Sequence, residues 1–230
     1  RPTRFRPPLM DWEALRLSLK LACASTLLLL PLGLALAYLL AFGRFRGKAL
    51  LEALTTLPLI LPPTVLGFYL IVALGPRSPL GHAWESLTGS PLVFSFSGLL
   101  CAQVFTNLPF FLQPLVSSLG GVDRRLLEVA STLNSGRLGT YLRVALPLGW
   151  RGLLSGTILA FAHAIGEFGV VLMVGGNLPG RTRTASIALF DQVQSFDMAG
   201  ANRTALLLLG LAFAVLTGTA LLRGKERSWR

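Results

Sequence analysis

Charged residues are scarce in this sequence, and their scarcity excludes most classes of protein. Only 13% of the 230 residues are Asp, Glu, Lys or Arg, whereas 53% are hydrophobic. A soluble domain rarely has so few charges, because about a quarter of its residues are normally charged. The apolar residues are gathered into blocks that are long enough to cross a bilayer. The composition therefore predicts a membrane protein.

Histidine and cysteine, which form most metal and nucleophilic sites, are also almost absent. The chain has two of each, namely His82, His163, Cys23 and Cys101. Both cysteines lie inside apolar blocks, so we interpret them as small buried hydrophobic residues, and neither a disulfide nor a metal site is indicated. The chain also lacks a Gly-x-x-x-x-Gly-Lys-Ser/Thr sequence, so any ATP chemistry must belong to a partner.

Five apolar blocks predict five membrane spans, which together make an all-α, multi-pass helical bundle in one domain over residues 1–230. The spans are expected near residues 14–42, 50–74, 91–117, 150–176 and 202–223. The first block follows a basic arm and is too long for the apolar core of a signal peptide, so we expect it to be retained. Pro58, Pro62 and Pro63 interrupt the second block, and the carbonyls that they leave unpaired need partners in protein or in a wet cavity.

The net charge of +11 raises nucleic acid as a partner, but the distribution of the charge favours a membrane. Twelve Lys and Arg residues lie in loops and a tail on one side, within residues 44–48, 124–151 and 223–230. The opposite loops hold only four, Arg77, Arg181, Arg183 and Arg203. The positive-inside rule then places residues 122–148 and the C-terminus in the cytoplasm and the N-terminus outside. Five basic residues before the uncharged run 22–42, namely Arg1, Arg4, Arg6, Arg16 and Lys20, oppose this orientation.

The polar segment between the third and fourth spans has the pattern of two short helices. Apolar side chains recur on one helical face, at Leu126, Val129, Ala130 and Leu133. The run 134–136 (Asn-Ser-Gly) should end this helix, because Asn and Gly tolerate the left-handed backbone. A second helix is expected over Leu138–Leu146 and should stop before Pro147. Such an amphipathic hairpin on the aqueous side of a bundle predicts a docking surface for a soluble partner.

His163 and Glu167 are ionisable residues far from the ends of an apolar block, and their i, i+4 spacing predicts that they share a helix face. Three interpretations stay open: a structural pair between helices, the lining of a translocation path, or the acid–base pair of a membrane-embedded enzyme. The enzyme is the least favoured, because no nucleophile or metal cluster accompanies the pair. Asn107 in the third span poses the same choice between helix contact and path lining. In the outer connection, Arg181 and Arg183 either attract an anion or are ordinary solvated charges.

Two stretches resemble the permease subunits of bacterial ABC importers with the type I, MetI-like fold. Residues Glu128–Leu148 (EVASTLNSGRLGTYLRVALPL) are similar to the EAA loop of that family, with matches at Glu128, Ala130 and Leu146–Pro147. Val129 replaces an Ala, and Asn134 stands where the family usually has Gly. Because Asn also adopts the left-handed conformation, we expect the turn to survive.

The second stretch, Phe161–Thr184, is similar to the molybdate/tungstate branch of this family. It contains Gly-Glu-Phe-Gly followed by Asn-x-Pro-Gly-x-Thr-x-Thr, although Val170–Val171 departs from the Ala-Thr of the branch. Leu57–Leu70 and Phe45–Leu50 are also similar to this branch. A sulfate/thiosulfate-type permease is the alternative, because such permeases share the Gly-Glu portion.

The resemblance implies a subunit that imports molybdate or tungstate across the bacterial plasma membrane and is not itself an enzyme. The partners implied are a second copy of the chain, two cytoplasmic ATPase subunits that bind ATP and Mg²⁺, an external oxyanion-binding protein and membrane lipid. No cofactor on this chain is expected, and nucleic acid is not expected as a partner.

The ATPase-coupling residues implied are Glu128, Val129, Ala130, Ser131, Leu133, Asn134, Ser135, Arg137 and Pro147. The candidates for the translocation path or a helix contact are His163, Glu167, Phe168, Asn107 and Thr64. The outer-mouth candidates are Arg181 and Arg183.

Overall fold

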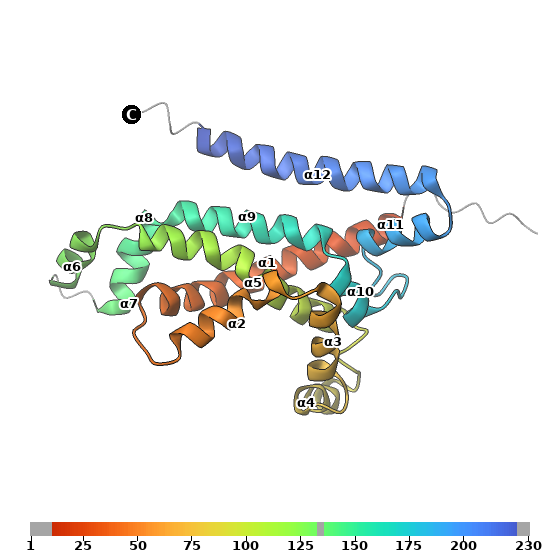
Figure 1. The fold of residues 1–230 in the computed structure, drawn as a ribbon, viewed down its shortest axis with the longest axis horizontal. Helices are drawn as coiled ribbons and strands as arrows, with labels where there is room; N and C mark the ends of the chain where they lie inside the picture. The colour runs from red at the N-terminus through yellow and green to blue at the C-terminus, as the bar shows by residue number, and fades with distance from the viewer. Residues whose placement is uncertain (1–10, 133–135, 225–230) are drawn as a thin grey trace, which may run out of the picture. The chain divides into compact units, whose positions relative to one another are not determined.

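The computed structural model describes residues 11–132 and 136–224, and within them every regular element is a helix (Figure 1). The predicted all-α class is therefore confirmed. The helices in chain order are α1 (Trp12–Phe42), α2 (Lys48–Ile60), α3 (Pro63–Leu74), α4 (Pro79–Thr88), α5 (Phe96–Gly120), α6 (Arg124–Thr132), α7 (Arg137–Thr140), the π-helical turn η1 (Tyr141–Ala145), α8 (Leu146–Leu148), α9 (Trp150–Gly166), α10 (Gly169–Gly175), α11 (Ala185–Gln194) and α12 (Met198–Gly224).

Three helices in the described part of the chain, α1, α5 and α12, are long and apolar enough to cross a membrane. A fourth span arises if Arg137–Leu148 and Trp150–Gly166, which are bent by 76°, count as one. The stretches predicted as spans over 50–74 and 150–176 are each interrupted instead. α2 ends at Ile60, and Leu61 is extended before two consecutive prolines, because the residue before a proline avoids the helical conformation. The total of five spans stays a prediction.

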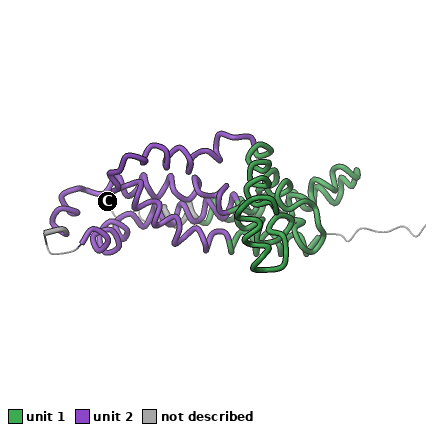
Figure 2. Tube along the Cα trace, turned by 90° about the horizontal axis from the view of Figure 1, so that it is seen from below, with its two compact units in different colours: residues 1–24, 63–103, 164–230 green, residues 25–62, 104–163 purple. Residues whose placement is uncertain are grey.

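The chain forms two compact units, coloured separately in Figure 2. Unit 1 contains residues 1–24, 63–103 and 164–230, and unit 2 contains residues 25–62 and 104–163. Helices α1, α5 and α9 each contribute residues to both units. The single-domain organisation over residues 1–230 stays a prediction.

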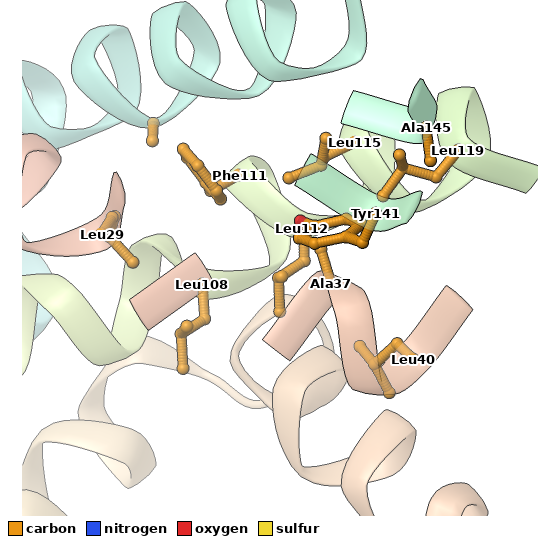
Figure 3. Close-up of a cluster of buried hydrophobic side chains, with 11 residues drawn as sticks. Leu29, Ala37, Leu40, Leu108, Phe111, Leu112, Leu115, Leu119, Tyr141 and Ala145 are labelled. Carbon is orange, nitrogen blue, oxygen red and sulfur yellow. The ribbon is translucent and has the colours of Figure 1, made fainter. Parts of the chain in front are cut away.

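The core of unit 2 is built around Phe111 of α5, which is completely buried. Figure 3 shows the side chains of this cluster, to which α1 contributes Leu29 and Ala37, and η1 contributes Tyr141 and Ala145. The turn η1 thus belongs to the same core as two membrane-length helices, although it lies in the polar segment of the sequence.

Helices α5 and α9 approach each other closely in unit 2 because glycines line the contact. A side chain at Gly152 would collide with Ser118 and the carbonyl of Pro114, and one at Gly156 would collide with the carbonyl of Phe111. The two glycines are four residues apart on α9, which is the spacing of a small-xxx-small helix contact in membranes. The sequence GLLSG therefore determines how near the α9 backbone can come to α5.

Unit 1 contains a second apolar cluster, formed by Leu21, Leu99, Val171 and Ile187. Here α3 packs on α10, and the contact again depends on small residues. A side chain at Gly67 would meet Met173, and one at Gly169 would meet Pro63. α10 is thereby held against the helix that follows the double-proline break.

Candidate functional site: the 122–148 hairpin and the buried polar contacts

The 122–148 hairpin begins with helix α6, which confirms the first predicted helix. The Asp123 side chain accepts a hydrogen bond from the backbone N–H of Arg125 at 2.9 Å and so caps its start. The predicted apolar face is divided: Leu126 and Val129 are 50% and 58% exposed, whereas Ala130 is buried within the chain. α6 therefore presents two large apolar side chains outward while a small one faces its own protein.

Several predicted coupling residues have no structural account. Leu133, Asn134 and Ser135 lie outside the described residues, and so does the side chain of Ser131. The predicted turn at Asn134 therefore stays a prediction. Glu128 and Arg137, on either side of this gap, are both exposed.

The second helix of the hairpin differs from the prediction, because it does not stop before Pro147. The helical backbone continues through η1 and α8 to Leu148, and the chain turns at Gly149. The widened π turn is the physical reason: the N–H of Leu146 bonds to the carbonyl of Tyr141, five residues back. This wider turn leaves room for the proline ring and does not need the backbone N–H that proline lacks. Pro147 is therefore accommodated inside the helix.

Tyr141 attaches the hairpin to α1. Its hydroxyl donates a hydrogen bond to the carbonyl of Leu34 at 2.9 Å. Its ring centroid lies 5.1 Å from that of Tyr38 and 5.9 Å from that of Phe42. Sequence reasoning missed this residue, although an aromatic side chain in a polar segment was a usable signal. The arrangement fixes the base of the hairpin to helices of unit 2.

His163 is part of a contact between α5 and α9 within unit 2. Its Nδ1 lies 2.8 Å from Oδ1 of Asn107, and its ring stacks on Phe110 with centroids 3.9 Å apart. Because an amide oxygen only accepts, the imidazole Nδ1–H is the donor. Asn107 is completely buried. The geometry agrees with the interpretation of both residues as a helix contact.

Glu167 does not share a helix face with His163, so that prediction is wrong. Helix α9 ends at Gly166, and Glu167 stands in the break before α10. The Glu167 carboxylate accepts a hydrogen bond from the N–H of Val170 at 3.1 Å, and its carbonyl accepts one from the hydroxyl of Ser186 at 2.7 Å. The side chain competes for backbone donors that a continuous helix would use, which accounts for the break.

The remaining candidates lie in unit 1 with different environments. Phe168 packs on Phe190 with ring centroids 4.9 Å apart, whereas Thr64 is exposed in the first turn of α3. Arg183 is paired with Asp191 at 2.8 Å and with Asp11 at 3.7 Å, so it holds the connection between α10 and α11 to α11 and to the start of α1. Arg181 is exposed. Of the two predicted outer-mouth cations, Arg183 thus has carboxylates already beside it.

The fold and the hairpin define a class of transport protein, and comparison with known families agrees. The profile of the family described as "Binding-protein-dependent transport system inner membrane component" matches residues 30–223. The chain belongs to this family, which confirms the resemblance to ABC importer permeases seen in residues 128–148 and 161–184.

Within this class the chain is similar to curated molybdenum transport permeases. It is 46% identical to the molybdenum transport system permease protein ModB of Azotobacter vinelandii, over 90% of this chain and 91% of the relative. It is 37% identical to ModB of Escherichia coli strain K12, over 90% of both chains. It is also 32% identical to the sulfate transport system permease protein CysW of Synechococcus elongatus, over 93% of this chain and 74% of the relative.

A solved structure with the same fold is a bacterial alginate ABC transporter in complex with an alginate pentasaccharide-bound periplasmic protein. Its TM-score to this chain is 0.72, with 12% identity, over 90% of this chain and 76% of the other. At that identity the likeness establishes the fold alone.

Proposed function

We propose that this chain is the membrane subunit of an ATP-driven importer of molybdate or tungstate. The observation that carries the proposal is the 46% identity to a molybdenum transport permease over nearly the full length of both chains. The Gly-Glu-Phe-Gly and Asn-x-Pro-Gly-x-Thr-x-Thr sequences of residues 166–184 support the same substrate class. A sulfate/thiosulfate-type permease is the second candidate, because CysW covers the chain at 32% identity.

The chain itself transports and does not catalyse a reaction in this proposal. Its curated relatives are transport permease proteins, and ATP and Mg²⁺ belong to two cytoplasmic ATPase subunits. The alternative of a membrane-embedded enzyme that uses His163 and Glu167 is less favoured, because the relatives are transport permeases, and because His163 contacts Asn107 of α5 while Glu167 accepts a hydrogen bond from Val170 of α10.

The exposed face of α6 supports the 122–148 hairpin as the ATPase docking site. Leu126 and Val129 supply apolar contacts that a cleft on the ATPase can cover, and Glu128 and Arg137 supply charges at its edge. Because Tyr141 is bonded to Leu34 and packed in the core of unit 2, a displacement of the hairpin is transmitted to α1. Closure of the ATPase pair on ATP would thus move the membrane helices as packed bodies, and hydrolysis would reverse the movement.

A second copy of the chain completes the translocation path in this proposal. Helix α12 supports it, because its large apolar side chains Leu206, Leu209, Phe213 and Leu216 are between 49% and 69% exposed. Lipid and the second copy together would cover such surfaces. The orientation follows the distribution of basic residues, with the C-terminus and the hairpin in the cytoplasm and the N-terminus outside.

Co-purification with the ATPase tests the docking site. Leu126→Asp combined with Val129→Asp should abolish co-elution of the ATPase, because two charges would enter an apolar contact. Leu87→Asp is the matched control, since Leu87 is 84% exposed on α4 in a predicted outer loop. Retained co-elution of the double variant would contradict the docking site.

Uptake into vesicles tests the substrate. Vesicles that contain the chain and its ATPase should accumulate radiolabelled molybdate when the external binding protein and ATP are supplied. Excess tungstate should suppress the uptake, whereas excess sulfate should not. Uptake of radiolabelled sulfate without uptake of molybdate would favour the second candidate.

A further inference from the structure

The charges of the hairpin and of the helix that follows it are divided into two parts. α6 carries residues of both signs. Between Glu128 and Glu167 the sequence has no acidic residue but three basic ones, Arg137, Arg143 and Arg151. Basic residues without acidic neighbours beside a membrane span are typical of contact with anionic lipid. The first part of the hairpin therefore suits a protein partner, whereas the stretch that leads into α9 suits a negatively charged surface.

Arg143 of η1 and Arg151 in the first turn of α9 stand on either side of the turn at Gly149, and both are exposed. In the part of the chain that the structure describes, no salt bridge involves Arg143. Arg183 differs, because two carboxylates already lie beside its guanidinium group. A guanidinium group binds phosphate through two parallel hydrogen bonds, so Arg143 is suited to a phosphate group from outside the chain.

Large apolar side chains are exposed beside these two arginines. Leu142, Leu148 and Trp150 are 48%, 52% and 45% exposed. Trp150 is the first residue of α9, which forms a candidate span together with the helix before it. Tryptophan is enriched where a span meets the headgroup layer. Exposed leucine and tryptophan together with arginine are the composition of a segment that lies in the membrane interface.

The opposite side of the same segment is packed in the core of unit 2. Tyr141 and Ala145 are buried there, and the Tyr141 hydroxyl donates its hydrogen bond to the carbonyl of Leu34 on α1. The segment thus has one side in the core and one side exposed. A ligand that holds Arg143 on the exposed side also holds η1 against α1.

We propose that residues 142–151 bind anionic phospholipid of the cytoplasmic leaflet. Arg143 and Arg151 contact the phosphate of the headgroup, and Leu148 and Trp150 lie among the upper parts of the acyl chains. This inference rests on the proposed function for its orientation, which places the start of α9 at the cytoplasmic face. The bound lipid keeps η1 in place and so supports the transmission of hairpin movement to α1.

Native mass spectrometry of the purified chain, with phosphatidylglycerol and phosphatidylcholine added in detergent, measures the bound lipid directly. The unaltered chain should retain phosphatidylglycerol in preference to phosphatidylcholine. Arg143→Gln combined with Arg151→Gln should weaken the retention of phosphatidylglycerol about tenfold, because two basic groups are lost from the site. Arg143→Lys combined with Arg151→Lys keeps both charges and should weaken it by about threefold at most.

Arg124→Gln combined with Arg125→Gln is the matched control, because it removes the same charge from exposed positions on α6. This control should retain phosphatidylglycerol as the unaltered chain does. Equal weakening in both glutamine variants would show that net charge alone attracts the lipid, and would overturn the site. Displacement of the lipid by excess inorganic phosphate would also overturn it, because phosphate has no acyl chains for Leu148 and Trp150 to contact.

Uptake into proteoliposomes tests the effect on coupling. With the ATPase, loaded binding protein and ATP supplied, the unaltered chain should import molybdate about threefold faster when phosphatidylglycerol is added to phosphatidylcholine. Arg143→Gln combined with Arg151→Gln should show no such increase and should still co-elute with the ATPase. Loss of co-elution would assign the two arginines to the ATPase contact and overturn the lipid site. Retention of phosphatidylglycerol without any molybdate uptake would instead support the lipid site and contradict the proposed function.

Discussion

Hydrogen bonds determine what the polar residues inside the apolar blocks do at the scale of the residue. Glu167 and His163 are four positions apart in the sequence, yet one caps the start of α10 and the other bonds to Asn107 on α5. Their spacing predicted a shared face only on the assumption of a continuous helix. The sequence thus identified both residues as polar positions inside an apolar block. It could not reveal the break at Gly166, because the break depends on the hydrogen bond that the Glu167 side chain accepts from the backbone.

The Asn107–His163 contact should show a measurable coupling between its two side chains. In a double-mutant cycle of Asn107→Ala and His163→Ala, measured as unfolding free energy in detergent, we expect a coupling of about 0.6–1.7 kcal/mol, as for other hydrogen bonds between membrane helices. As a control, Asn107→Ala and Leu142→Ala should be additive, because Leu142 is exposed on η1. A coupling below about 0.3 kcal/mol would show that the contact adds nothing to stability.

Small residues control the packing of helices at the scale of the element. Gly152 and Gly156 allow α9 to lie against the carbonyls of α5, and Gly67 allows α3 to lie against α10. The sequence indicated helices and breaks in these regions, but a glycine in an apolar block does not reveal its neighbour. Only the tertiary structure shows which atoms lie opposite each glycine and would collide with a larger side chain there.

Gly156→Ala should destabilise the α5–α9 contact. The added methyl group would collide with the backbone carbonyl of Phe111, which cannot move without bending α5, so we expect a loss of about 1–3 kcal/mol. Thermal unfolding of the purified chain measures the loss. Gly210→Ala on α12 is the matched control: nothing lies within 4 Å of its position, so stability should stay the same or rise. Equal melting temperatures for both variants would contradict close packing at Gly156.

Tyr141→Phe should weaken coupling without abolishing ATPase docking. The change removes the hydrogen bond to Leu34 while the ring can keep its packing against Tyr38 and Phe42. We expect normal co-elution of the ATPase and a reduced transport rate per ATP hydrolysed, measured in proteoliposomes. Tyr38→Phe is the control, since it retains the bond of Tyr141. A ratio of transport to ATP hydrolysis equal to that of the unaltered chain would show that the Tyr141 hydroxyl plays no part in coupling.

The distribution of charge is the main indicator of orientation at the scale of the whole molecule. Twelve basic residues on one side and four on the other predict a cytoplasmic hairpin, and the apolar blocks alone cannot assign a side. Orientation in the membrane depends on the basic residues near all of the spans together. It is therefore a property of the whole chain as it inserts into the membrane.

Cysteine labelling measures this orientation. After Cys23 and Cys101 are replaced by Ala, Arg137→Cys should react with a membrane-impermeant maleimide only when the cytoplasmic face is open to the reagent. Leu87→Cys, on the exposed surface of α4, should react from the outside in intact cells. Labelling of Arg137→Cys in intact cells would show that the hairpin lies outside the cell. That result would contradict the predicted orientation and the proposed docking site.

The sequence by itself determined the helical class, the membrane setting, the position of the hairpin and the family. The first three properties follow from local composition and periodicity, which need no knowledge of distant residues, and the family follows from the resemblance of residues 128–148 and 161–184 to known permeases. Only the tertiary structure shows the π turn that accommodates Pro147, the hydrogen bond from Tyr141 to Leu34, the contact of His163 with Asn107 and the hydrogen bond from Val170 to Glu167. Each of these depends on which groups are brought together from distant parts of the chain or on the exact path of a turn, and hydropathy contains neither.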